Sequence, residues 1–313
     1  MATYHANAGS KPRIAVAGVG ALGLPVVLAL LEASHPVTIL TRSADQKKEG
    51  IPSDANVTYA TVDYKSVDSL KEALKGHFGV VSTLNITSAG DQEPLIEAAI
   101  LAGVTRFIPS EFGADSTNPN VQALPFYAAK LAIQKKLAEV SAESPGFTYT
   151  IVINGPFLDW CLDRAFLSID LKKHSATIFN GGDRKFSVTT LANVAKAVVG
   201  IFAHVELTKN RIIHVHDAVL TQHGIIALAK RRDPSDWTLQ HSSIEETKAN
   251  ALATFARGDP DELWGAISGM ILTAVYGEGY GAEFTGRTQN EILGVPLLTE
   301  EELEEVIAVY QPN

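Results

Sequence analysis

Short apolar runs alternate with longer amphipathic stretches through the first half of the chain. The runs are rich in Val and Ile, which is typical of buried strands, and the stretches between them carry apolar residues at helical spacing. The predicted strands are 14–17, 37–40, 57–60, 80–84, 106–109 and 147–152, and the predicted helices are 22–31, 67–74, 92–102 and 125–140. This alternation predicts a doubly wound α/β fold with a parallel sheet, the Rossmann arrangement.

The second half of the chain is less regular and richer in helices. Helical patterns occur at 191–202, 224–230, 243–255, 261–276 and 300–309. A further apolar run, Arg211 to Val215, predicts a strand that we expect to join the main sheet. A boundary near Pro156 separates the two halves. We therefore predict a dinucleotide-binding Rossmann domain over residues 1–155 and a smaller, helix-rich substrate-binding domain over residues 156–313.

Three glycines follow the first predicted strand in the pattern Gly18-x-Gly20-x-x-Gly23. The first glycine permits a tight turn, the second lets a pyrophosphate approach the backbone, and the third allows the helix to pack closely on the strand. Ala21 and Leu22 then stand at the start of the helix, where free N–H groups favour an anion. The alternative is a plain glycine-rich turn. The position of the motif between strand and helix favours a dinucleotide site.

The end of the second predicted strand indicates which dinucleotide is bound. A site for NAD usually carries Asp or Glu about 20 residues beyond the glycine motif, where the carboxylate binds the ribose 2′-hydroxyl. Here Thr41, Arg42 and Ser43 occupy that place, and Lys47 follows. A guanidinium and a hydroxyl suit a 2′-phosphate, so we predict NADPH. The alternative is a basic loop exposed to solvent.

Charge and cysteine content narrow the remaining classes of function. The net charge of −9 argues against a general binder of nucleic acid or of an anionic membrane surface. A single cysteine, Cys161, excludes an internal disulfide framework and a CxxC metal site, and we expect no bound metal. Residues 1–11 are polar and lack the apolar core of a signal peptide, and the apolar run 21–31 is too short to cross a membrane. We expect a soluble cytoplasmic protein.

The helix predicted at 125–140 carries a candidate proton donor. Lys130 interrupts a run of small and apolar residues, and Tyr127 lies three residues earlier on the same helix face. A lysine in an apolar cleft has a lowered pKa and can transfer a proton near neutral pH. The alternative is a surface lysine beside Lys135 and Lys136, because most helix lysines are solvated.

Several segments resemble those of a known family. The segment Phe107 to Gly113, followed by a helix with an isolated lysine, resembles the isoflavone reductase and NmrA-like branch of the atypical short-chain dehydrogenases. Arg42 after the second strand and Asn154 to Phe157 after the sixth are similar to that branch, and Ile178 to Val188 resembles its hairpin. The resemblance covers Arg13 to Val215 well and the remainder loosely.

The resemblance implies NADPH-dependent reduction, with Lys130 as the catalytic residue. Hydride would pass to a small aromatic or conjugated substrate, while Lys130 protonates or stabilises the oxygen that gains charge. The resemblance also assigns further contacts. Further contacts with the cofactor would come from Asp63 near the adenine, from Thr83, Leu84 and Asn85 near the nicotinamide ribose, and from Lys130, Asn154, Pro156 and Phe157. Contacts with the substrate would come from Tyr127, Phe157 and Trp160.

Two departures from related patterns limit what is carried over. The branch usually has the motif Gly-x-x-Gly-x-x-Gly, and here Ala17 stands at its first glycine position. This difference affects the expected geometry of the loop and not the prediction of nucleotide binding. Tyr127 and Lys130 are one residue closer than the Tyr-x-x-x-Lys pair of typical short-chain dehydrogenases, so Tyr127 is not assigned as proton donor. The alternative function is a non-catalytic NmrA-like regulator that senses the dinucleotide and acts through a protein partner. For the reductase we expect a small-molecule partner, with a homodimer as one option.

Overall fold

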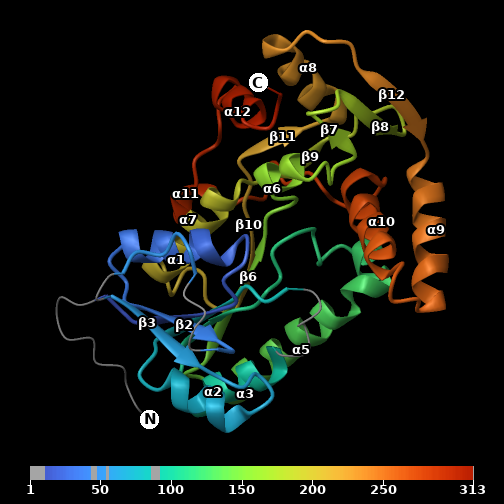
Figure 1. The fold of residues 1–313 in the computed structure, drawn as a ribbon. Helices are drawn as coiled ribbons and strands as arrows, with labels where there is room; N and C mark the ends of the chain where they lie inside the picture. The colour runs from blue at the N-terminus through green and yellow to red at the C-terminus, as the bar shows by residue number, and fades with distance from the viewer. Residues whose placement is uncertain (1–10, 44–47, 54–55, 86–91, 313) are drawn as a thin grey trace.

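Every strand of the main sheet runs parallel to its neighbours (Figure 1). The computed structural model describes residues 11–43, 48–53, 56–85 and 92–312. The seven strands are β1 (Ile14–Ala17), β2 (Val37–Thr41), β3 (Val57–Thr61), β4 (Gly79–Ser82), β5 (Arg106–Ile108), β6 (Thr148–Ile153) and β10 (Arg211–His214), in the order β10-β6-β5-β4-β1-β2-β3. The predicted doubly wound fold is confirmed, and the order changes direction between β1 and β4.

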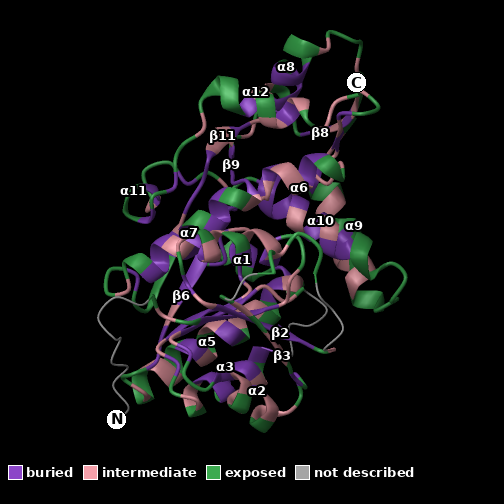
Figure 2. Ribbon diagram, turned by 60° about the vertical axis from the view of Figure 1, so that its left-hand side comes forward, coloured by how far each residue is buried: buried purple, intermediate pink, exposed green. Residues whose placement is uncertain are grey.

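Helices cover both faces of this sheet because its central strands are buried on both sides. Successive side chains of a strand point to opposite faces. Ile14 and Val16 belong to a core with α1 (Gly23–Glu32) and α7 (Leu191–Ala203). Ala15 and Ala17 belong to another core with helices α2 (Val67–Leu74), α3 (Gln92–Leu101) and α5 (Ala128–Glu143). Figure 2 shows the buried residues concentrated on the sheet and on the inward sides of the helices.

Elements from the second half of the chain complete the main sheet and the helical layer on one of its faces. β10 pairs in parallel with β6, which confirms the prediction that the run near 211–215 joins the main sheet. Helix α7 packs on α1, and α11 (Asn290–Leu293) packs on α7. The approach of α11 is close, since a Cβ on Gly200 would lie 2.7 Å from the Cα of Leu293. The main sheet and the helices that cover it therefore include segments that follow Pro156 in the chain.

The remaining elements form a second core, seen at the top of Figure 1. This core gathers apolar residues between Leu158 and Ile307. Its elements are α6 (Leu158–Asp163), β7 (Ile169–Asp170), β8 (Ser175–Phe179), β9 (Phe186–Val188), β11 (Ala218–Leu220), α8 (Gln222–Arg232), α9 (Ile244–Arg257), α10 (Leu263–Tyr276) and α12 (Glu300–Ala308). The largely exposed strand β12 (Thr238–Ser242) pairs with β8 at the edge of this core. Across the described residues, no helix combines the length and apolar character that a membrane span needs.

The hairpin expected over Ile178 to Val188 does not form. β8 lies between β7 and β12 in a three-stranded sheet, so both of its edges are already paired. β9 pairs instead with β11 in a separate two-stranded sheet. The turn that joins β8 to β9 passes through Asn180, Gly181 and Gly182, all with positive φ. The prediction was wrong because a local turn does not decide which edge a strand uses.

The helix predicted from Pro125 begins with a tighter turn. Pro125–Tyr127 form a 3₁₀ turn, η2, and the α-helix proper, α5, starts at Ala128. Proline at the first position of the turn is favourable, because its missing N–H would have no partner there. A short helix, α4 (Pro119–Gln122), precedes this turn. Tyr127 therefore stands at the junction between η2 and α5, one turn before Lys130.

Candidate functional site

The glycine turn at the end of β1 forms an open cradle. Gly18 has a φ of +90°, and a Cβ on Gly23 would overlap the carbonyl oxygen of Gly18. A Cβ on Gly20, in contrast, would meet no heavy atom within 4 Å. No side chain caps the start of α1 at Leu22. The Leu24 N–H donates to the Gly20 carbonyl at 3.1 Å and Pro25 has no N–H, so an anion would meet the exposed backbone of Gly20 and Ala21. The open turn fits a pyrophosphate.

Two substitutions separate binding from folding at this turn. Gly20→Val is expected to keep the melting temperature and to abolish measurable NADPH binding, because its side chain enters the cradle. Gly23→Ala is expected to lower stability by about 1–3 kcal/mol through overpacking, because its Cβ would overlap Gly18 and lie 2.7 Å from Thr83 Oγ1. Thermal unfolding and calorimetric titration measure the two effects. Wild-type NADPH affinity in Gly20→Val would contradict the assignment.

Loops after three strands are joined at the carboxyl edge of the sheet. The hydroxyl of Thr83, which follows β4, donates to the Ala17 carbonyl at 3.3 Å and also to the Gly18 carbonyl. The Ser110 hydroxyl, which follows β5, donates to the Leu84 carbonyl at 2.6 Å. These bonds lie where the strand order changes direction, which is where ligands bind in open α/β sheets. The predicted contact Asn85 is exposed on the same loop as Thr83 and Leu84.

The predicted 2′-phosphate residues stand at the end of the neighbouring strand β2. Arg42 directly follows this strand, and its side chain is exposed. The turn is locally ordered, because the Thr41 hydroxyl donates to the Ser43 carbonyl at 3.0 Å and accepts from the Ser43 N–H at 3.3 Å. Lys47 lies outside the described residues. An exposed guanidinium at this strand end can reach a phosphate bound next to the cradle.

Asp63 lies one strand further out, after β3. Its side chain is exposed, and its carboxylate accepts from the Lys65 N–H at 2.9 Å. The Asp63 N–H donates to the Ser69 hydroxyl at 3.1 Å. These bonds shape the connection between β3 and α2. Asp63 therefore has a structural function in this turn, and its predicted position near the adenine remains a prediction.

Lys130 points from the first turn of α5 toward the loop after β5. Its ammonium donates to the main-chain carbonyl of Glu111. Burial lowers the pKa of Lys130, and the charge of the Glu111 carboxylate opposes that shift. Burial likewise raises the pKa of Glu111, which is 3% exposed. Lys130 is thus placed at the carboxyl edge of the sheet. Its ammonium loses a proton more readily than that of a solvated lysine.

Tyr127 is buried beneath the same edge. Its side chain is 3% exposed and packs among Val121, Leu124 and Met270. The ring centroid lies 4.9 Å from that of Phe126 in an edge-on arrangement. Burial raises the pKa of Tyr127, and the charge of Glu111 adds to the shift, so its phenol stays protonated over the usual pH range. A substrate contact by Tyr127 remains a prediction.

The segment after β6 closes the other side of the site. Asn154 is fully buried, and its N–H donates to the Gly113 carbonyl at 3.2 Å. Pro156 is partly buried, and Phe157 packs against the same core as Val19 of the glycine turn. Phe157 and Val19 thus border the same core on the face of the sheet that α1 and α7 cover.

Trp160, the remaining predicted substrate contact, packs in the second core. The centroid of its ring system lies 5.4 Å from that of Phe166, and the guanidinium carbon of Arg164 lies 4.9 Å from the Trp160 ring centroid. Trp160 follows Phe157 by one turn at the start of α6. Its ring contacts are with the aromatic and basic residues that follow it along the chain.

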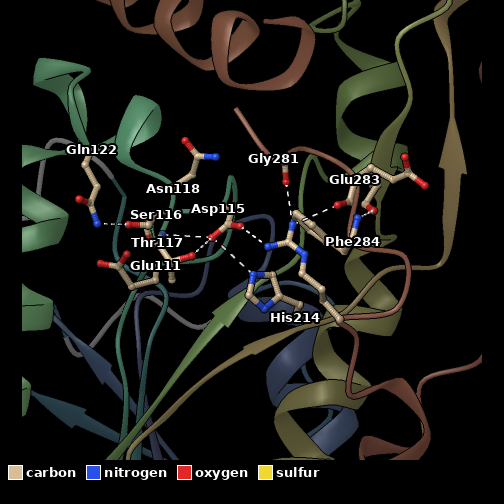
Figure 3. Close-up of polar contacts among 12 residues, drawn as sticks. Glu111, Asp115, Ser116, Thr117, Asn118, Gln122, His214, Gly281, Glu283 and Phe284 are labelled. Atoms are coloured by element: carbon tan, nitrogen blue, oxygen red, sulfur yellow. Dashed lines mark hydrogen bonds and ion pairs between the residues drawn. The ribbon is translucent and has the colours of Figure 1, made fainter. Parts of the chain in front are cut away.

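A buried carboxylate that sequence reasoning missed ties this region together (Figure 3). Asp115 is 2% exposed and lies 2.8 Å from Arg287 Nη1 and 3.4 Å from His214 Nε2. Burial opposes its ionisation, but the close approach of His214 Nε2 and hydrogen bonds from Thr117 and Arg287 hold the pKa of Asp115 well below its ordinary value. Arg287 also donates to the Gly281 carbonyl at 3.0 Å. Asp115 thereby links the loop after β5 to β10 and to the segment after α10.

A separate hollow of about 550 Å³ lies between the β8–β9 turn and segment 277–283. Its charged lining is mixed, with Asp183, Arg184, Lys185 and Glu283. None of the predicted site residues lines it, so the site rests on the strand ends described above. Within the described ranges, no three His, Cys, Asp or Glu side chains are grouped as metal ligands would be.

Comparison with known sequences supports these assignments of fold and family. The chain matches the NmrA-like family over residues 10–257. It is 33% identical to the oxidoreductase aprR of Aspergillus flavus over 301 residues, which is 94% of this chain and 97% of the relative. It is 30% identical to the isoflavone reductase homolog IRL of Zea mays over 213 residues, 64% of this chain and 67% of the relative.

Solved structures of low sequence identity share the fold. A crystal structure of isoflavone reductase superposes with a TM-score of 0.75 at 20% identity, covering 96% of this chain and all 100% of the other. The complex of leucoanthocyanidin reductase with NADPH from Vitis vinifera gives a TM-score of 0.71 at 19% identity, covering 95% and 99%. With the sequence match, which spans most of its length, these findings confirm the resemblance: the chain belongs to the NmrA-like family.

Proposed function

We propose that this protein is an NADPH-dependent reductase that transfers hydride to a small aromatic or conjugated substrate. One observation carries the proposal. Along the carboxyl edge of the sheet, hydrogen bonds join the loop of Thr83 to Gly18 and to Ser110, and Glu111, next to Ser110, accepts from Lys130. A glycine turn suited to a pyrophosphate and a partly buried ammonium thus lie on one connected edge, which supports hydride transfer coupled to proton transfer.

The chain offers a place for each charged part of the cofactor. The cradle at Gly20 would hold the pyrophosphate, and Arg42 would bind the 2′-phosphate. The bound nicotinamide supplies the hydride. Relatives of the same fold are known as complexes with NADPH or NADP⁺, which supports this choice of cofactor. In this proposal residues 1–155 bind the cofactor, assisted by α7 and β10, and residues 156–313 bind the substrate.

Lys130 would serve the acceptor atom that gains negative charge. As an ammonium it can protonate or stabilise an oxygen, and a lowered pKa makes the proton easier to transfer near neutral pH. The Glu111 carbonyl holds the ammonium in place through its hydrogen bond. Phe157, at the edge of the core that Val19 also borders, would lie beside the nicotinamide, and Tyr127 and Trp160 would contact the substrate.

Relatives point to aromatic substrates. A phenylcoumaran benzylic ether reductase of Nicotiana tabacum is 34% identical over 146 residues, 46% of its length. A structure of the same fold holds NADP⁺ and (+)pinoresinol, at 19% identity to this chain. These compounds belong to the relatives, and they support an aromatic or conjugated acceptor here as a class.

Titration and turnover together test the proposal. Calorimetric titration with NADPH should show binding, and NADPH absorbance should fall with at least one acceptor from a panel of conjugated carbonyls, quinones, imines and benzylic ethers. Tight binding without oxidation across the panel would instead identify the dinucleotide-sensing regulator. Absence of binding to NADPH and NADH alike would overturn both functions.

A further inference from the structure

Glu111 is a buried carboxylate whose side chain the mechanism above leaves unused. It is 3% exposed, and its Oε2 accepts from Gln134 Nε2 at 2.7 Å. Its Oε1 is buried with no hydrogen-bond partner among the described residues. A buried carboxylate without full hydrogen bonding costs free energy unless a nearby cation compensates. The nearby cation is Lys130, whose ammonium bonds to the main-chain carbonyl of the same residue.

Helix α5 presents two side chains to this one residue. Lys130 donates to the Glu111 carbonyl, and Gln134, one turn later on the same face, donates to the Glu111 carboxylate. Gln134 Nε2 also donates to the Ser116 hydroxyl at 2.8 Å, so the amide is held from both sides. Figure 3 shows Glu111 on the same loop as Ser116 and Asp115. The loop and the helix are therefore locked together around residue 111.

We propose that Glu111 is a positioning residue for Lys130: its carbonyl holds the ammonium nitrogen in place, and its buried carboxylate keeps that nitrogen protonated. That Lys130 uses this proton in catalysis rests on the proposed function. The effect of Glu111 on the protonation of Lys130 does not depend on that function. Without the carboxylate, desolvation alone would act on the lysine and favour the neutral amine.

Other titratable groups near Lys130 and Glu111 are either engaged by their own partners or exposed to solvent. Tyr127 on η2 is the other titratable group that the Glu111 charge affects, and its pKa rises. Asp115, on the same loop, is engaged by Arg287 and His214. On α3, which packs on α5, Glu93 and Glu97 are exposed. Solvent screens such exposed carboxylates. Burial is the larger influence on the Lys130 pKa, and the Glu111 carboxylate is the charged group that opposes it.

Competitive labelling of amines tests the proposal without a substrate. Only the neutral amine reacts with acetic anhydride, so the pH dependence of labelling at each lysine, measured by mass spectrometry, reports its pKa. Removing the negative charge in Glu111→Gln should lower the labelling midpoint of Lys130 by about one pH unit or more. Lys135, 78% exposed on the same helix, serves as an internal reference that should not move.

Two further variants make the test specific. Lys130→Met gives the reciprocal measurement, because loss of the cation should raise the pKa of the Glu111 carboxyl, read by ¹³C NMR of glutamate-labelled protein. Glu139→Gln removes an exposed carboxylate from α5 and should leave the Lys130 midpoint unchanged. Thermal unfolding verifies that each variant folds, and Lys130→Met decides the test if Glu111→Gln does not fold. An unchanged Lys130 midpoint in folded Glu111→Gln, or an unchanged Glu111 pKa in folded Lys130→Met, would overturn the proposal.

The readout also separates this inference from the proposed function. Labelling requires neither cofactor nor acceptor, so a failed search for an acceptor would count against the reductase and not against the Glu111 assignment. Where turnover is measurable, its alkaline limb should move to lower pH in Glu111→Gln, because the proton donor would lose its proton earlier.

Discussion

Lys130→Ala is expected to lose turnover while it keeps its affinity for NADPH. A positioned proton donor contributes about 10²–10⁴-fold to rate, so kcat should fall by about that factor. Affinity should persist because the ammonium bonds to the protein's own Glu111 carbonyl, while the cradle and Arg42 lie on other loops. Calorimetric titration gives the affinity, and NADPH oxidation with an identified acceptor gives the rate.

Lys135→Ala is the matched control for this experiment. Lys135 lies on the same helix, is 78% exposed and lies 3.8 Å from Glu139. Its removal deletes the same charge without touching the carboxyl edge of the sheet, so activity should remain at the wild-type level. Wild-type turnover in Lys130→Ala would remove lysine from the mechanism and leave binding as the supported property.

Arg42→Ala is expected to erase the preference for NADPH over NADH. Hydrogen bonds to a charged group contribute about 1.5–3 kcal/mol, which corresponds to a loss of about 10- to 150-fold in NADPH affinity. NADH lacks the 2′-phosphate, so its affinity should stay nearly constant. The ratio of the two dissociation constants, measured by calorimetry, is the quantity that decides.

An arginine at the opposite end of a strand provides the comparison. Arg13 is exposed immediately before β1, whereas Arg42 follows β2 at the carboxyl edge. Arg13→Ala should therefore leave both dissociation constants unchanged. Equal NADPH affinity in Arg42→Ala and wild type would show that another group recognises the phosphate, or that the protein does not discriminate.

The parallel sheet was predictable because its central strands are buried on both faces. The runs Ile14–Ala17 and Val37–Thr41 are fully buried, so they appear in the sequence as short stretches rich in Val, Ile and Leu between helices. The glycine turn between β1 and α1 was also predictable, because a tight turn between a strand and a helix needs glycine at particular positions. The strand at Arg211–His214 was predicted to join the main sheet, and its pairing with β6 became visible only in the structure.

Contacts between distant segments were not predictable from local patterns. Asp115 and Arg287 are 172 positions apart, and no periodicity links them. Glu111 was visible only as part of a family-like segment, and its contacts with Lys130 and Gln134 required the three-dimensional placement of α5. The pairing of β8 with β7 and β12 likewise depended on which strand edges remained open.

The sheet cannot be finished while its last strand is still being synthesised. Residues 154–210 separate β6 from β10, and a ribosome adding about 5–20 residues per second needs roughly 3–11 s to make them. During that interval the outer edge of β6 has no partner, and the apolar surface that α7 later covers is exposed. A nascent chain at this stage presents an open strand edge to other nascent chains and to chaperones.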